Sequence, residues 1–350
     1  MKNTTAQNPM QLIWTNAKAL EQGILALSFG AGQDSTTILY QLVYNPAFAL
    51  EKLQGRALIV IFCDTGNERK EVYEHLWMIK DLCAAYGIKF VHLAGNIKSK
   101  KTKHSTVDFH QAKGRDTDHI ITAFHTSASN SLQAKNESND SLPVRNNPSC
   151  TSNLKILPFY RYMNSLCAEL LGKEKVRDHG KRDLVEFCGH TRKLEVMIGF
   201  AVGEEKRMEG ASKDQPQKWW QSVEKTFPLI TDLQLDRNGC IAFMESTPHG
   251  ACGPSMCKMC PNITKQTLVL MWRLKERRND LLDWIRAERR KLNTWAPIQA
   301  EKGATNIAAL GSSKTLVEEL RLALEKFEDV STEDLLEHEF RNGHCISTGY

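Results

Sequence analysis

The sequence contains no apolar run long enough to cross a membrane. Its longest uninterrupted apolar stretch is ALIVIFC at 57–63, whereas a bilayer-spanning helix needs about 20 such residues. The first residues, MKNTTAQNPMQLIW, also lack the apolar centre of a secretory signal peptide. No internal repeat is visible. From these absences we expect a cytoplasmic protein without a membrane partner.

The chain also lacks a strong excess of charge of either sign. Lys and Arg number 46 and Asp and Glu 41, which gives a net charge of +5 over 350 residues. With 41% hydrophobic and 25% charged residues the composition is that of an ordinary globular protein, which excludes a wholly disordered or fibrous chain. Mild basicity permits a nucleic-acid partner without requiring one. The length indicates about two domains.

Short apolar strands and amphipathic helices alternate through the first 95 residues. The predicted strands are 23–28, 57–63 and 88–93, and the predicted helices between them are 36–44 and 70–86. A continuous apolar run such as 57–63 is typical of a parallel strand covered by helices on both faces. The β-α-β-α-β order predicts an α/β fold with a doubly wound, Rossmann-like parallel sheet.

The remaining chain is less regular. The polar stretch at 95–149 predicts an insertion, of which about 124–149 is expected to be a long loop or disordered. Beyond it the pattern predicts a helix at 155–171, strands at 184–187 and 195–200, a basic helix at 264–292, and short helices at 313–327 and 332–340. We therefore expect an α/β domain at 1–225 that includes this polar insertion, a cysteine-rich module with the basic helix at 226–300, and a helical tail at 301–350.

A glycine-bearing loop, SFGAGQDS at 28–35, follows the first strand and opens the next helix. Its glycines let the backbone approach a ligand, and the helix N-terminus offers N–H groups to an anion. Asp34 is suited to hold Mg²⁺ on phosphate oxygens. No Gly-Lys-Ser/Thr sequence is present, which excludes a Walker loop. A dinucleotide-binding loop, with Asp64 after the second strand, and a pyrophosphatase-type loop both stay open.

Several further motifs follow in a familiar order, and with the loop they resemble the phosphoadenylyl-sulfate (PAPS) reductase family of the PP-loop adenine-nucleotide α-hydrolases. The resemblance covers about residues 24–275. Its motifs are FCDTGNE at 62–68, NPSCT at 147–151, IGFAVGEEKR at 198–207, FPLI at 227–230, RNGC at 237–240, SMCKMCP at 255–261 and WRLK at 272–275.

The resemblance implies an ATP or PAPS/APS site with Mg²⁺. Asp64, Thr65 and Gly66 would lie near the adenosine. Gly199 would line the far side of the pocket, and Arg207 would face phosphate or sulfate. The phosphates would be held by five residues of the loop, Ser28, Gly30, Gly32, Asp34 and Ser35. Asp34 and Arg207 are the candidate catalytic residues within the pocket.

Ten cysteines are many for a chain expected to be cytoplasmic. Three of them are clustered as Cys252-x4-Cys257-x2-Cys260, a spacing suited to metal binding. The resemblance pairs Cys257 and Cys260 with Cys150 and Cys240, leaving Cys252 as an extra or alternative ligand. Four cysteines suit a [4Fe–4S] cluster, which the resemblance favours, or structural zinc.

Cys345 lies near the end of the sequence, where sulfonucleotide reductases carry a nucleophilic cysteine. It is preceded by Gly343-His344, which departs from the Glu-Cys-Gly-x-His pattern of those enzymes. Cys345 is therefore a candidate nucleophile for direct PAPS reduction, and an ordinary exposed thiol is the alternative.

The segment 263–292 carries nine Lys or Arg against four acidic residues, with tryptophans interleaved. Such a surface suits the phosphate backbone of DNA or tRNA, although a solvated amphipathic helix has the same pattern.

Three hypotheses follow. The first is an enzyme of α-phosphate (adenylylation) or sulfur-transfer chemistry, acting on nucleic acid in one version. The second is a PAPS or APS reductase. The third is a non-catalytic nucleotide-sensing subunit of a defence or mobile-element complex, which works with a protein partner.

Overall fold

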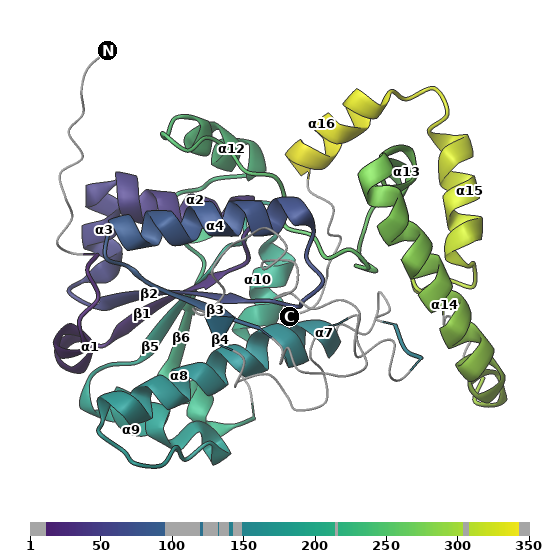
Figure 1. Ribbon diagram of the computed structural model, residues 1–350. Coiled ribbons are helices and arrows are strands. Elements are labelled where there is room, and N and C mark those ends of the chain that lie inside the picture. The colour runs from purple at the N-terminus through teal and green to yellow at the C-terminus, as the bar shows by residue number, and fades with distance from the viewer. Residues whose placement is uncertain are drawn as a thin grey trace.

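The computed structural model describes residues 12–94, 120–121, 132, 140–142, 149–213, 216–303 and 308–342. Its centre is a six-stranded sheet in the order β4-β3-β2-β1-β5-β6, and every neighbouring pair is parallel (Figure 1). The strands are β1 (Ile24–Phe29), β2 (Ala57–Cys63), β3 (Lys89–Leu93), β4 (Ile120–Ile121), β5 (Leu194–Ile198) and β6 (Val223–Thr226). The predicted doubly wound α/β fold is confirmed.

Side-chain alternation along the strands builds a core on each face of the sheet. In β1, Leu25 and Leu27 enter one core with α2, α4 and α12, whereas Ile24 and Ala26 enter the other with α8 and α9. Figure 1 shows these two helical layers on opposite sides of the sheet. Every residue of β2 is buried, because both of its faces are covered.

The helices of the sheet region are set by local caps and by these two cores. Thr15 caps α1 through the N–H of Lys18, and Asn45 caps α3 ahead of a proline at its first position. Their bounds are α1 (Asn16–Gln22), α2 (Gln33–Tyr44), α3 (Pro46–Leu53), α4 (Lys70–Ala85), α7 (Ser149–Thr151), α8 (Leu157–Leu170), α9 (Arg182–His190), α10 (Glu205–Ser212), α11 (Pro228–Thr231) and α12 (Arg237–Glu245). Short π and 3₁₀ turns are η1 (Ser152–Ile156), η2 (His179–Lys181) and η3 (Lys218–Ser222).

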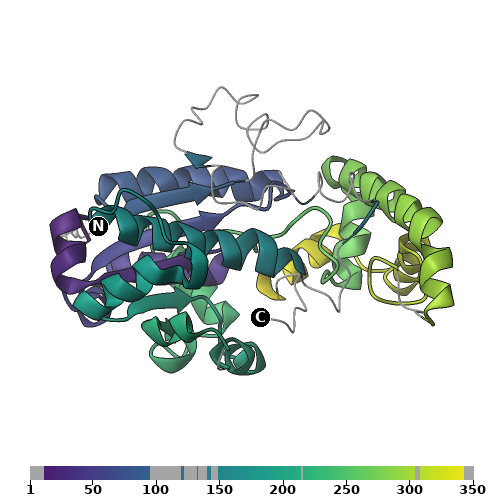
Figure 2. The same cartoon turned by 90° about the horizontal axis from the view of Figure 1, so that it is seen from below.

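Four further helices form a group beside the sheet, as Figures 1 and 2 both show. They are α13 (Lys265–Arg273), α14 (Lys275–Glu301), α15 (Leu316–Lys326) and α16 (Thr332–Asn342). Trp284 and Leu281 are fully buried in a core of their own, which includes Leu316 from α15. None of the helices in the described ranges has both the length and the apolar character that crossing a membrane requires.

Two of the predicted elements were wrong. The segment 184–187 belongs to α9 and not to a strand, because Leu184 and Phe187 lie three residues apart on one buried helix face. The predicted basic helix is broken at Leu274, whose extended backbone (φ −83°, ψ 120°) separates α13 from α14. Most of the predicted polar loop at 95–149 lies outside the described residues, although β4 falls within it.

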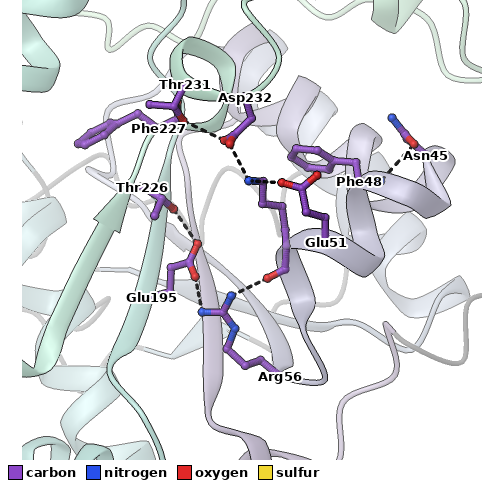
Figure 3. A network of polar contacts seen from close by, with 10 residues as sticks. Asn45, Phe48, Glu51, Arg56, Glu195, Thr226, Phe227, Thr231 and Asp232 are labelled. Carbon is purple, nitrogen blue, oxygen red and sulfur yellow. Dashed lines mark hydrogen bonds and ion pairs between the residues drawn. The ribbon is translucent and has the colours of Figure 1, made fainter.

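A buried ion pair joins the strands near their amino ends. Arg56, just before β2, pairs with Glu195 of β5, and the hydroxyl of Thr226 donates to the same carboxylate at 2.9 Å (Figure 3). The other guanidinium nitrogens of Arg56 donate to the carbonyls of Leu53 and Lys52. This end of the sheet is therefore closed by a satisfied polar network.

Candidate functional site

A cavity of about 500 Å³ opens at the carboxyl ends of β1 and β5. The chain leaves β1 through β2, β3 and β4 on one side and then returns to pair β5 with the other side of β1. Helices on the two sides of such a reversal diverge, and open α/β sheets bind their ligands in the crevice that results.

The loop at 28–35 forms the floor of this cavity. The N–H of Gly30 donates to the hydroxyl oxygen of Ser35 at 3.1 Å, and that hydroxyl donates to the carbonyl of Gly32 at 3.2 Å. Ala31 between them adopts a left-handed conformation (φ 55°), which is uncommon for a residue with a side chain. Ser35 therefore holds the loop in shape. It lines the cavity together with the other four predicted phosphate-binding residues, Ser28, Gly30, Gly32 and Asp34.

Two glycines let neighbouring segments approach the loop closely. A Cβ on Gly199, just after β5, would lie 2.7 Å from the backbone nitrogen of Ser35. A Cβ on Gly32 would lie 2.9 Å from the backbone nitrogen of Ser255, which brings the cysteine-bearing segment over the loop. The absence of a side chain on Gly199 thus lets the end of β5 pack directly against the start of α2. Gly199 is also one of the residues that line the cavity.

Two acids and two arginines alternate above the loop. Arg237 of α12 lies 3.2 Å from Oδ2 of Asp34 and 3.8 Å from Oε1 of Glu204, which also pairs with Arg207. Burial raises the pKa of Asp34 to about 6, although the charge of Arg237 opposes this. Oδ1 of Asp34 is buried without a hydrogen-bond partner among the described residues.

The wall away from the loop is apolar and aromatic with two amines. The guanidinium of Arg207 lies 4.4 Å from the ring centre of Phe200, and the amine of Lys225 lies 4.4 Å from that of Trp220. Lys155 enters from the π-helical turn η1, a distortion that often marks functional sites. The strand side chains that complete this wall are Ile61, Val196 and Ile198. The cavity therefore suits a ligand with an anionic end and a flat apolar end.

No protein-family model, curated protein or solved structure matches this chain.

The turn after β2 plays a different part from the loop after β1. Asp64 is fully buried and accepts from the N–H of Gly66 at 2.6 Å and the hydroxyl of Tyr73 at 3.0 Å, with His92 at 2.9 Å. Burial opposes ionisation of Asp64, but these hydrogen bonds and the charge of His92 lower its pKa overall. Thr65 donates to Glu68 at 2.8 Å. Asp64, Thr65 and Gly66 are not among the described residues that line the cavity.

The predicted metal ligands lie in different surroundings. Cys240 is fully buried in the core beneath α2 and α12, and Cys260 packs against the core of the helical group. Cys257 lies 3.4 Å from a carboxylate oxygen of Glu68. Burial above all, then the charge of Glu68 and to a smaller extent Cys150, raises the pKa of the Cys257 thiol. Cys252 lies 3.5 Å from the hydroxyl of Thr36.

Within the described residues no group of three or more Cys, His, Asp or Glu side chains is arranged to hold a metal. Among the described residues, Cys150, Cys240, Cys257 and Cys260 are therefore not gathered into one metal site. Cys345 lies outside the described residues.

Sequence reasoning missed Arg237 and Lys155 as site residues. Arg237 begins the RNGC motif and Lys155 follows the NPSCT motif by four residues, but in the chain both lie far from the loop that they face. Only the packing of α12 on α2 and the turn η1 bring them to the cavity.

Proposed function

We propose that this chain is a PP-loop enzyme that binds an adenine nucleotide in the cavity at the carboxyl ends of β1 and β5. The observation that carries the proposal is the place of the loop at 28–35. It lies at the reversal point of a parallel sheet, at the N-terminus of α2, beneath Arg207 and Arg237.

The charges of the cavity suit a polyphosphate. Four cations line it, Lys155, Arg207, Lys225 and Arg237, against the two acids Asp34 and Glu204. Guanidinium groups donate to phosphate oxygens in a planar fork. The buried oxygen of Asp34 would hold the Mg²⁺ that accompanies ATP. The aromatic wall would take the adenine.

Such a site supports attack at the α-phosphate. The cations and the loop N–H groups would stabilise the charge that develops as the α–β bond of ATP breaks, and an acceptor would become adenylylated with release of pyrophosphate. Transfer of sulfur to that acceptor, with release of AMP, is the step that the family resemblance adds to the proposal.

One observation favours PAPS or APS reduction as a second candidate. Asn342, the last residue of α16, lines the cavity. Cys345 follows three residues later, and three residues span at most about 11 Å. A thiolate within that reach could attack the sulfur of a bound sulfonucleotide, forming an S-sulfocysteine and expelling the nucleotide with its phosphate. An external dithiol would then reduce this S–S bond and release sulfite.

The exposed surface of helix α14 favours a nucleic acid, either DNA or tRNA, as the acceptor. Arg286, Arg289 and Arg290 are exposed on it, and Trp284 anchors its opposite face in the core. Basic side chains presented in this way suit a phosphate backbone.

A [4Fe–4S] cluster or zinc on Cys150, Cys240, Cys257 and Cys260 stays a proposal from the family resemblance. Iron, sulfide and zinc analysis of protein purified without oxygen tests it directly. Iron retained by a Cys257→Ala variant would contradict the proposed ligand set.

Nucleotide binding by a Gly199→Ala variant tests the site itself. The added methyl group would press on the backbone of Ser35, so we expect ATP affinity, measured by calorimetry, to fall by about 10- to 100-fold. Gly189→Ala in α9 is the control, because its Cβ meets nothing within 4 Å. Equal affinities in both variants would contradict binding at this loop.

The products then separate the three hypotheses. Pyrophosphate release from ATP supports adenylylation, and sulfite release from PAPS that is lost in Cys345→Ser supports reduction. Tight binding without pyrophosphate, AMP or sulfite, even with DNA or tRNA present, would instead support a nucleotide-sensing subunit.

A further inference from the structure

A second cavity, of about 540 Å³, lies where the start of α4 meets α14 and α16. Pro254 lines both this cavity and the nucleotide cavity, so only the segment around it separates the two. Figure 1 shows α16 approaching the helices α2 and α4 from the helical group. None of the hypotheses above uses this second cavity.

Two arginines from separate elements meet around one carboxylate in this cavity. Glu339 of α16 lies 3.6 Å from Nη1 of Arg69 and 2.7 Å from Nη1 of Arg277. The side chains of Arg69 and Glu339 are each only 6% exposed. Two guanidinium groups thus share one buried carboxylate, and the trio carries a net positive charge.

The trio leaves hydrogen-bonding capacity unused. Nη2 of Arg69 and Nε of Arg277 are buried without a hydrogen-bond partner anywhere in the described ranges. Leaving a buried charged donor unpaired is costly, so these atoms suit an incoming acceptor. Burial and the like charge of Arg277 lower the pKa of Arg69 to about 10, a further sign that its surroundings undercompensate it.

The N-terminus of α4 adds to this positive region. Arg69 is the N-cap of this 16-residue helix, and its side chain makes no capping hydrogen bond. The first N–H groups of a helix lack intrahelical partners and favour an anion. At the rim, Glu71 lies 3.7 Å from Nη2 of Arg277. Its charge and that of Glu337 oppose an anion less than a buried acid would, because both side chains are 57% exposed and screened by solvent. Glu333, also at the rim, is exposed.

We infer that Arg69, Arg277 and the N-terminus of α4 form a second anion site, for a phosphate group of the acceptor. This deepens the proposed function, on which the word acceptor rests. The shared chemistry is a phosphate group, which could belong to a nucleic-acid backbone or to a free phosphate compound. Glu339 partly compensates the site when it is empty.

The test titrates the full chain with two probes, inorganic phosphate and a short single-stranded oligonucleotide without a terminal phosphate. ATP is kept saturating, so that the loop at 28–35 is occupied. We expect Arg277→Gln to weaken binding by about tenfold or more, and Glu339→Gln to strengthen it by a similar factor. Glu337→Gln removes the same charge from the same helix outside the trio and should leave binding nearly unchanged.

Binding of both probes through Arg277 would indicate a general phosphate site, and binding of the oligonucleotide alone would indicate a nucleic-acid backbone. Both results support the site. Probe binding that survives Arg277→Gln, or that responds equally to Glu337→Gln and Glu339→Gln, would overturn it.

Arg277→Lys protects the test against a folding defect. This variant keeps the charge but loses the fork, so we expect an intermediate affinity with an unchanged thermal transition. If ATP fails to bind, the same titration without ATP in the Gly199→Ala background still tests the second site separately from the proposed function.

Discussion

At the amino ends of its strands the sheet carries a buried ion pair whose polar atoms are all engaged, whereas at the carboxyl ends it carries a buried carboxylate with an unpaired oxygen. Arg56 uses all three guanidinium nitrogens, and both oxygens of Glu195 accept. Asp34 pairs with a single arginine, Arg237, and burial raises its pKa. The difference indicates that one end is built for stability and the other holds unused bonding capacity for a ligand.

The largest expected effect comes from breaking the satisfied end. Glu195→Ala would leave Arg56 as an uncompensated buried charge, so we expect the free energy of unfolding to fall by about 3–5 kcal/mol. Denaturant unfolding measures this. The control is Glu224→Ala. Glu224 lies opposite Glu195 in the register of β6 against β5, but it is exposed. A Glu195→Ala variant as stable as this control would show that the two ends do not differ as described.

The second prediction concerns Asp34, where removing a charge should stabilise the protein. Its pKa is about 6 in the folded chain against an ordinary value of 3.8 for an aspartate, so the folded state holds its proton more tightly. Stability contributed by this group is therefore greatest below about pH 4, falls as pH rises to about 6, and stays low above that.

Asp34→Asn should remove this dependence and raise the free energy of unfolding at pH 7.5 by up to about 3 kcal/mol, while weakening the binding of Mg²⁺-ATP. Unfolding curves at pH 5 and 7.5 measure the gain. A variant less stable than the wild type at pH 7.5 would mean that the pairing with Arg237 outweighs the burial of Asp34.

The parts of the fold that were predictable from the sequence are those that a local pattern of residues determines. The strand at 57–63 and the loop at 28–35 were predictable because hydrophobic pattern and turn chemistry are local. The segment 184–187 was not, because four residues with apolar ends fit a strand and a helix face equally. The break at Leu274 has no glycine or proline to mark it.

Within the site, sequence reasoning identified the residues of one segment and missed partners brought in by packing. Asp34 follows from its loop, whereas Arg237 reaches it only because α12 lies on α2. An aspartate that follows a strand does not always face the ligand cavity, since Asp64 accepts hydrogen bonds from Gly66 of its own turn and from Tyr73 of α4.

The smallest expected effect sharpens the comparison between the two aspartates. Asp64 has a lowered pKa, so its contribution to stability is present above the unfolded value and is lost as pH falls through the folded value. Asp64→Asn should therefore destabilise the protein at pH 7.5, by about 1–2 kcal/mol, because the charged hydrogen bond with His92 is lost. The variant and the wild type should converge in stability at low pH, opposite in sign to Asp34→Asn. Equal behaviour of the two variants across the pH range would show that the ends of β1 and β2 are not specialised as we describe.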